Sequence, residues 1–148
     1  MNTAFKPSQR AALIGVIDPK SSNAAQSTGW VKSTAFFNFL AVVLVGVLGA
    51  SATVDAKLEQ ATDNAGTGAK DVVGKAITQL TKAGTDDSKQ VEINLTQTDL
   101  DFANGFKYFR LTITPATAAS LICGAIFGFD PRYGVASDSD AATVDEIV

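Results

Sequence analysis

The chain has 148 residues, enough for one domain with a sizeable core. It contains no histidine and a single cysteine, Cys123, which excludes histidine catalysis, an intrachain disulfide and a cysteine-based zinc site. Charged residues make up 18% of the chain, against about 25% in an average soluble domain. A surface this poor in charge is typical of a subunit that is partly covered by neighbours.

The net charge of −3 is unevenly distributed along the chain. Residues 1–34 are basic, with a net charge of +3, whereas residues 130–148 are acidic, with a net charge of −4. The middle of the chain is close to balanced, and no dense Lys/Arg stripe is present. This pattern argues against direct binding to nucleic acid.

The first 29 residues are expected to form an N-terminal arm. They contain Pro7, Pro19 and a run of small polar residues over 21–29, and only Ala11 to Ile17 offers apolar side chains. Such a segment would not hold itself in place, so it needs a partner to become ordered. We therefore assign residues 1–29 to an arm and residues 30–129 to the body.

Residues 35–54 carry no charge over 20 positions, which is long enough for a transmembrane helix. Asn38, Gly46 and Gly49 interrupt the stretch, and valine dominates its centre. From Ala52 onward, apolar and polar residues alternate with the period of a half-buried strand. These features favour two buried strands over a membrane span, and residues 1–12 lack the apolar core of a cleavable signal.

The rest of the body is predicted to consist of strands joined by turns. Strands are expected at 50–60, 76–81, 91–95 and 108–114, the last ended by Pro115, and a nearly all-apolar one at 118–127. Asn104-Gly105 is a tight-turn signal, and no long amphipathic helix is evident. Short strands with frequent turns predict an all-β fold, an antiparallel β-sandwich of jelly-roll or immunoglobulin-like type.

Groups that could carry chemistry are few. Asp63 and the pair Asp138 and Asp140 resemble fragments of calcium loops, but the remaining ligands at the required offsets are missing. The glycine-rich segment 66–70 lacks the spacing of a phosphate loop. Cys123 is expected to be a small buried hydrophobic residue. We predict no catalytic residue, no metal and no cofactor, and hence no enzyme.

The conspicuous aromatic, arginine and acidic side chains are better explained by contacts with other subunits than by chemistry. Aromatic residues and arginine are enriched at protein interfaces, and residues beyond the last strand are less assured of burial within the monomer. The acidic C-terminal arm, 130–148, offers carboxylates to a partner. The candidate interface residues are Trp30, Phe129, Arg132, Tyr133, Asp138 and Asp140.

Residues 30–135 show a strand–acidic turn–strand layout over 54–80 and the late segment Gly128-Phe129-Asp130-Pro131-Arg132-Tyr133. In this they resemble small β-sandwich structural proteins of tailed bacteriophages. The resemblance implies a virion component, such as a capsid decoration (cement) or minor head or tail protein. It implies no catalytic residues.

The sequence therefore predicts a homo-oligomeric structural protein of a virion, made in the host cytoplasm. Its partners would be the major capsid protein or other virion proteins, clamped by the two arms. Three alternatives stay open at this stage. They are a tail or head–tail connector component, a sandwich that binds carbohydrate or the host surface, and a small membrane protein using residues 35–54.

Overall fold

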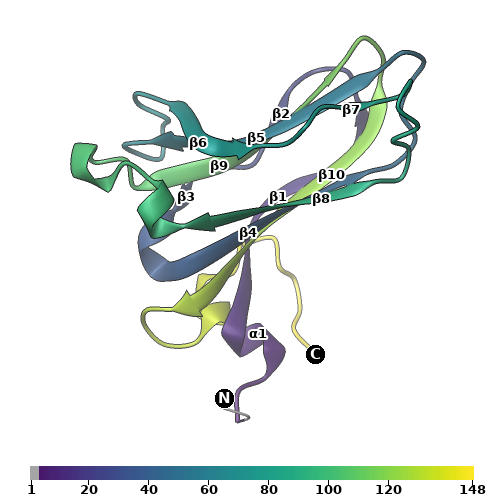
Figure 1. Cartoon of the computed structure of the whole chain (residues 1–148). Helices are drawn as coiled ribbons and strands as arrows, with labels where there is room; N and C mark the ends of the chain where they lie inside the picture. Colours follow the sequence, from purple (N-terminus) through teal and green to yellow (C-terminus); the bar gives the residue numbers. More distant parts are fainter. Residues whose placement is uncertain (1–3) are drawn as a thin grey trace.

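The computed structural model describes residues 4–148 and is built almost entirely of β-strands (Figure 1). The strands are β1 (Ala11–Ser22), β2 (Gln26–Ser27), β3 (Val31–Lys32), β4 (Phe36–Val45), β5 (Thr53–Ala61), β6 (Lys70–Ala76), β7 (Leu80–Thr81), β8 (Gln90–Thr96), β9 (Tyr108–Ala116) and β10 (Ser120–Pro131). Short helical segments are α1 (Pro7–Arg10), η1 (Ser33–Ala35), η2 (Gln97–Asp99), η3 (Phe102–Asn104) and η4 (Ala136–Ser139). None of the helices within residues 4–148 has the length and apolar character needed to cross a membrane.

The strands form two antiparallel sheets that face each other. Sheet A has the order β1-β10-β4-β8, and sheet B has the order β2-β9-β5-β6, with β3 also paired to β9 and β7 to β5. The earliest strand pairs with the last, the next with the one before last, and so on inward to β5 and β6. A long hairpin rolled across two sheets gives this order, which is the jelly roll. The predicted antiparallel sandwich is thus confirmed, in its jelly-roll form.

The core lies between the inward faces of the two sheets. Period-2 alternation in β4 and β10 turns Phe39, Val43 and Ile126 inward, where they are at most 3% exposed. From sheet B, Phe109 and Leu111 point back at them and are fully buried. The Phe39 and Phe109 rings meet edge to face across the sandwich, with their centroids 4.8 Å apart.

Glycines in β10 make room for this aromatic packing. Gly128 lies so close to Phe36 that a Cβ added there would stand 2.6 Å from the ring. The Phe36 side chain is 1% exposed, so it has no space into which it could move. Gly124 faces Leu111 in the same way, at 2.9 Å. Small residues at these inward positions of β10 let the large side chains of neighbouring strands fill the core.

Several predicted elements match the structure and others do not. The strands expected at 50–60, 91–95 and 108–114 are β5, β8 and β9, and the segment 35–54 supplies β4 and the start of β5. The strand expected at 76–81 is wrong, because the main strand β6 ends at Ala76 and only Leu80–Thr81 pairs beyond it. Pro115 does not end β9. Thr28 donates its N–H to the Leu111 carbonyl, so the backbone N–H and C=O groups of odd-numbered β9 residues point toward β2. Because β2 does not extend as far as Pro115, no partner there requires the N–H that proline lacks.

The largest correction concerns the N-terminal arm. Residues 1–3 lie outside the described residues, but Ala11–Ser22 forms β1, the 12-residue edge strand of sheet A. Its partner is β10, and paired residues lie 98 to 118 positions apart in sequence. The short apolar run of β1 gains its order from that long-range pairing, which local sequence does not reveal.

The C-terminal segment also rests on the body of its own chain. Ala141 donates its N–H to the Leu13 carbonyl at 2.7 Å, and the Leu13 N–H donates to an Asp140 carboxylate oxygen at 2.8 Å. Ala136 of η4 is fully buried, and η4 contacts both α1 and β1. This segment therefore closes part of the free edge of β1.

Candidate functional site

The outer face of sheet B is polar and its charges are paired. Glu59 of β5 accepts hydrogen bonds from Arg110 Nε at 2.8 Å and from Thr112 Oγ1 at 2.6 Å. Lys57 lies 3.5 Å from Glu59 and 2.6 Å from Asp71 of β6. These side chains come from outward positions of three neighbouring strands, as expected for a sheet face in contact with water.

The charges of this face shift the pKa values of its members. Burial by itself raises the pKa of Glu59, but the hydrogen bonds from Thr112 and Arg110 and the charges of Arg110 and Lys57 outweigh it, so the pKa lies below its ordinary value. The hydrogen bond to Asp71 is the main cause that raises the pKa of Lys57, against the opposing effect of burial. Both shifts favour the charged forms, so the face stays ionised at neutral pH.

The outer face of sheet A has the opposite character. Most outward positions of β1, β10 and β4 are apolar, with Ser21 and Asn38 as polar exceptions toward the two ends of the sheet, and none of the apolar side chains is fully covered by the rest of the chain. We call this surface the apolar face. Its members are Leu13, Val16, Leu40, Val42, Leu44, Leu121, Cys123, Ala125, Phe127 and Phe129.

Strand register places these side chains in rows across the sheet. Phe127 of β10 pairs with Leu13 on one side and with Leu40 on the other. One row further along, Ala125 pairs with Val16 and with Val42. Each row ends on a polar residue of the edge strand β8, whose outward positions are Gln90, Glu92, Asn94 and Thr96.

A hollow of ≈ 440 Å³ lies at the far end of the apolar face. Leu44 and Leu121, which are 41% and 48% exposed, stand beside it, and Cys123 lies between them on β10. The expectation that Cys123 would be buried is wrong, because alternation along β10 turns it outward and leaves it half-buried. Small side chains flanked by exposed leucines give the face a shape that can receive an apolar side chain from another molecule.

Three of the predicted interface residues gather where β10 ends. Phe129 faces outward and pairs with Asn38. The Arg132 guanidinium lies 4.3 Å from the centre of the Phe37 ring and donates a hydrogen bond to Gln97. Tyr133 is 82% exposed. This cluster continues the apolar face at its end, with Phe37 49% exposed.

The other three predicted interface residues lie elsewhere. Trp30 is half-buried on the side of sheet B, with the Arg110 guanidinium 4.5 Å from its ring. Asp140 uses a carboxylate oxygen to hold Leu13 of its own chain. Asp138 is exposed in η4, close to Gly134. The six residues therefore do not form one surface.

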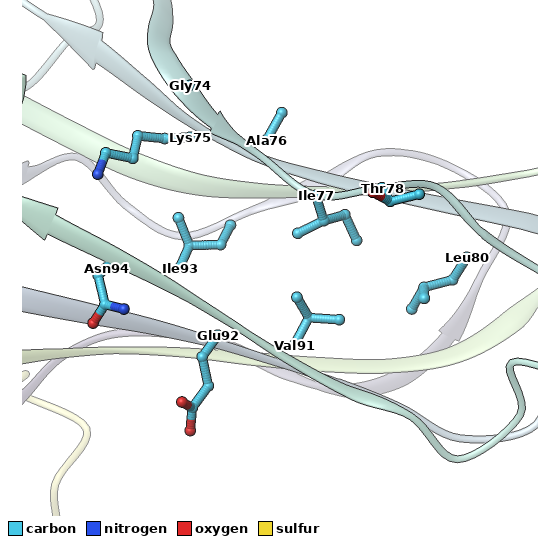
Figure 2. Close-up of a pocket in the computed structure, with 10 residues that line it drawn as sticks. All are labelled: Gly74, Lys75, Ala76, Ile77, Thr78, Leu80, Val91, Glu92, Ile93 and Asn94. Carbon is cyan, nitrogen blue, oxygen red and sulfur yellow. The ribbon is translucent and has the colours of Figure 1, made fainter.

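A second groove, of ≈ 480 Å³, lies at the seam between the two sheets (Figure 2). Ile77, which follows β6, and Leu80 of β7 face Val91 and Ile93 of β8, while Glu92 points away. Polar residues also line the groove, namely Lys75, Thr78, Glu92 and Asn94, and Lys75 forms an ion pair with Asp99 at 3.1 Å. Within residues 4–148, no group of three or more acidic, cysteine or histidine side chains is arranged to hold a metal ion.

The apolar face was missed at the level of the sequence, although a signal was present. Strands covered on both faces have nearly continuous apolar sequences instead of an alternating pattern. Residues 39–48 and 121–129 have that continuous character. The sequence predicts buried strands in 35–54 and a nearly all-apolar strand at 118–127, but the jelly roll covers only one face of β4 and of β10.

The fold thus defines the chain as a jelly-roll β-sandwich with one polar and one apolar outer face. The sequence matches no family model, and no curated protein is significantly similar to it. Among solved structures, it is similar to one of tobacco necrosis virus, with 14% identity over 84% of this chain and 95% of that chain, and a TM-score of 0.38. An empty virus-like particle of cowpea mosaic virus gives 10% identity over 93% of this chain and 88% of that chain, with a TM-score of 0.42. A structure of infectious bursal disease virus, Gx strain, has 6% identity over 86% of this chain and 33% of that chain, with a TM-score of 0.38.

Proposed function

We propose that this chain is a non-enzymatic structural subunit of a virus particle, which packs its apolar face against other subunits. The observation that carries the proposal is the contrast between the two outer faces of one sandwich. Sheet B is covered by the paired charges of Lys57, Glu59 and Arg110, whereas the corresponding surface of sheet A is covered by leucine, valine and phenylalanine. A jelly roll that works alone in water would carry polar side chains on both outer faces.

The size of the apolar face fits this use. Three strands at about 4.8 Å spacing and about nine residues at about 3.4 Å each give roughly 450 Å² of projected area. That lies within the range of about 300–600 Å² for the largest apolar patch of an ordinary monomer, and such patches are often functional. Together with the polar row on β8, it has the layout of an apolar interface core with a polar rim.

Jelly rolls occur in virus capsids, and also in lectins and cupins, so the fold alone does not select a function. The virion is favoured by the scarcity of charge and by the apolar face. The resemblance to tailed-phage proteins supports a finer assignment, a capsid decoration or minor capsid protein that stabilises the head. Repeated by symmetry, many modest contacts would stabilise the shell strongly.

The test is a charge placed in the apolar face. Leu44→Lys should leave the fold intact, because Leu44 points outward, but should abolish incorporation into particles. Thr114→Lys is the matched control, because it adds the same charge at an outward position of sheet B. Wild-type chain that is absent from purified particles, or a Leu44→Lys chain that is incorporated as well as the wild type, would overturn the proposal.

Copy number separates the finer possibilities. Quantitative mass spectrometry of purified particles should find on the order of hundreds of copies for a decoration protein, and about six to twelve for a ring-forming connector. Deleting residues 1–10 and the last 12 residues tests whether the chain ends help to hold the particle. Unchanged occupancy would reject a clamping role for them.

A further inference from the structure

The free edge of β8 differs from the other strand edges of the sandwich. β8 pairs with β4 over seven residues without a register shift, and it contains neither proline nor glycine. Among the described residues, no strand pairs with its far side. Regular, unprotected edges of this kind are the ones to which another strand can add.

The remaining edges are protected in ways that β8 is not. β1 has two register shifts, carries Pro19 and Lys20, and is partly closed by the C-terminal segment. β6 has a register shift and a left-handed glycine, Gly74, with φ of +73°. β2 is only two residues long. Bulges, proline, lysine and short length are the devices by which proteins prevent edge pairing.

The backbone of β8 presents alternate residues to the open side. Val45 donates its N–H to the Lys89 carbonyl, so the N–H and C=O groups of odd-numbered β8 residues point toward β4. Those of even-numbered residues point toward the open edge of the sheet. Gln90, Glu92 and Asn94 therefore point their N–H and C=O groups away from the sheet. The Thr96 N–H is already taken by an Asp99 carboxylate oxygen at 2.7 Å, which ends the open stretch.

We propose that β8 of one copy pairs antiparallel with β8 of a second copy, about a two-fold axis at Ile93. This would join two four-stranded sheets A into one continuous sheet. The register centred on Ile93 is the one in which all seven residues of both strands overlap. It places Glu92 opposite Asn94 of the second copy, and Val91 opposite Leu95, so that polar residues meet polar ones on the outer face and apolar residues meet apolar ones inside.

The neighbouring register is disfavoured by charge. Centring the pair on Glu92 would set two glutamates directly against each other, and like charges in that position oppose pairing. In the groove of Figure 2, Ile77 and Leu80 face Val91 and Ile93, whose side chains lie on the inner face of β8. The pairing uses the backbone edge of β8 and not the apolar side chains of β1, β10 and β4, so it goes beyond the proposed function and does not depend on it.

The test exploits the symmetry, which makes each substitution count twice per dimer. Asn94→Glu sets a glutamate against Glu92 of the second copy and should weaken dimerisation about three- to thirty-fold at low salt. Asn94→Lys should strengthen it by a similar factor. Combining Glu92→Lys with Asn94→Glu restores opposite charges and should recover the dimer. All of these positions are exposed, so folding itself should be unaffected.

Sedimentation equilibrium of the full chain measures the dissociation constants, and hydrogen exchange locates the contact. The amides of Glu92 and Asn94 should become protected as concentration rises, whereas those of Val91 and Ile93 should be protected throughout. A dimer insensitive to these charges, protection that appears only when a different protein is added, or a chain that stays monomeric would each overturn the proposal. Leu44→Lys should leave this dimer intact, which separates its failure from that of the proposed function.

Discussion

Replacing Gly128 by alanine should be among the most damaging single-methyl changes in this chain. The added Cβ would stand 2.6, 2.7 and 2.8 Å from three carbons of the Phe36 ring. Normal contacts between such carbons are about 3.5–4.0 Å, so either the ring or β10 must move by roughly 1 Å. The ring is 1% exposed and meets Phe39 edge to face, with centroids 6.2 Å apart, so it has no free volume to enter.

The expected cost follows from this geometry. Overpacking a well-packed core costs about 1–3 kcal/mol, and the reduced entropy of the unfolded chain returns about 0.4–1 kcal/mol for a glycine-to-alanine change. We expect Gly128→Ala to lower the free energy of unfolding by about 2 kcal/mol. For a chain of this length, the Tm should fall by about 4–8 °C.

The same substitution at two other glycines provides a comparison for the loss of stability expected at Gly128. At Gly124 the new methyl would meet only the ends of Leu111 and Ile113, at 2.9 and 3.1 Å, which can rotate, so Gly124→Ala should cost about 1 kcal/mol. At Gly29 nothing lies within 4 Å, so Gly29→Ala should be neutral within about 0.5 kcal/mol. Thermal and urea unfolding followed by circular dichroism measure all three variants. A Gly128→Ala protein as stable as Gly29→Ala would refute the packing argument.

Three further predictions concern the outer face of sheet B and the C-terminal segment. Because the pKa of Glu59 is lowered in the folded chain, its contribution is present above the unfolded pKa of about 4.3 and is lost as the pH falls through the folded pKa. Glu59→Gln should therefore cost about 1 kcal/mol at pH 7 and much less at pH 3, as measured by urea unfolding at both pH values; an equal loss at both would contradict the prediction. Arg110→Lys removes the flat guanidinium over Trp30 and should change the emission of this single tryptophan while lowering stability by about 1 kcal/mol, whereas an unchanged spectrum would argue against stacking. Asp140→Ala removes the acceptor for the Leu13 N–H, so hydrogen exchange at Leu13 should accelerate by about tenfold and proteases should cleave the C-terminal segment sooner. Unaltered exchange at Leu13 would show that Ala141 alone holds the segment.

The local patterns of the sequence were sufficient for much of the body. Val91, Ile93 and Leu95 alternate with polar residues, and β8 has that alternation in the structure. Phe109, Leu111 and Ile113 also alternate with more polar residues within the strand predicted at 108–114, and all three are fully buried. These elements were predictable because a strand with one buried and one solvent-exposed face alternates apolar and polar residues along its own sequence.

What could not be predicted depends on contacts between distant parts of the chain. β1 contains Pro19 and ends in small polar residues, so its pairing with β10 is decided outside its own sequence. The same holds for Asp140, whose acceptor role requires Leu13 to lie beside it. The apolar face was hidden for a different reason, because a continuous apolar run does not say whether its second face is covered by the same chain or by another.

Because the outer face of sheet A is apolar and that of sheet B is charged, the molecule would have a fixed orientation in any layer that it helps to build through the apolar face. Sheet A would lie against the layer, and the turn between β5 and β6, residues 62–69, would then belong to the side that carries Lys57 and Glu59. That turn is largely exposed and is held by its own hydrogen bonds, from Ala65 and Thr67 to Asp63. A foreign peptide inserted there would accordingly be displayed away from the layer on every copy, with the same polarity across the whole array.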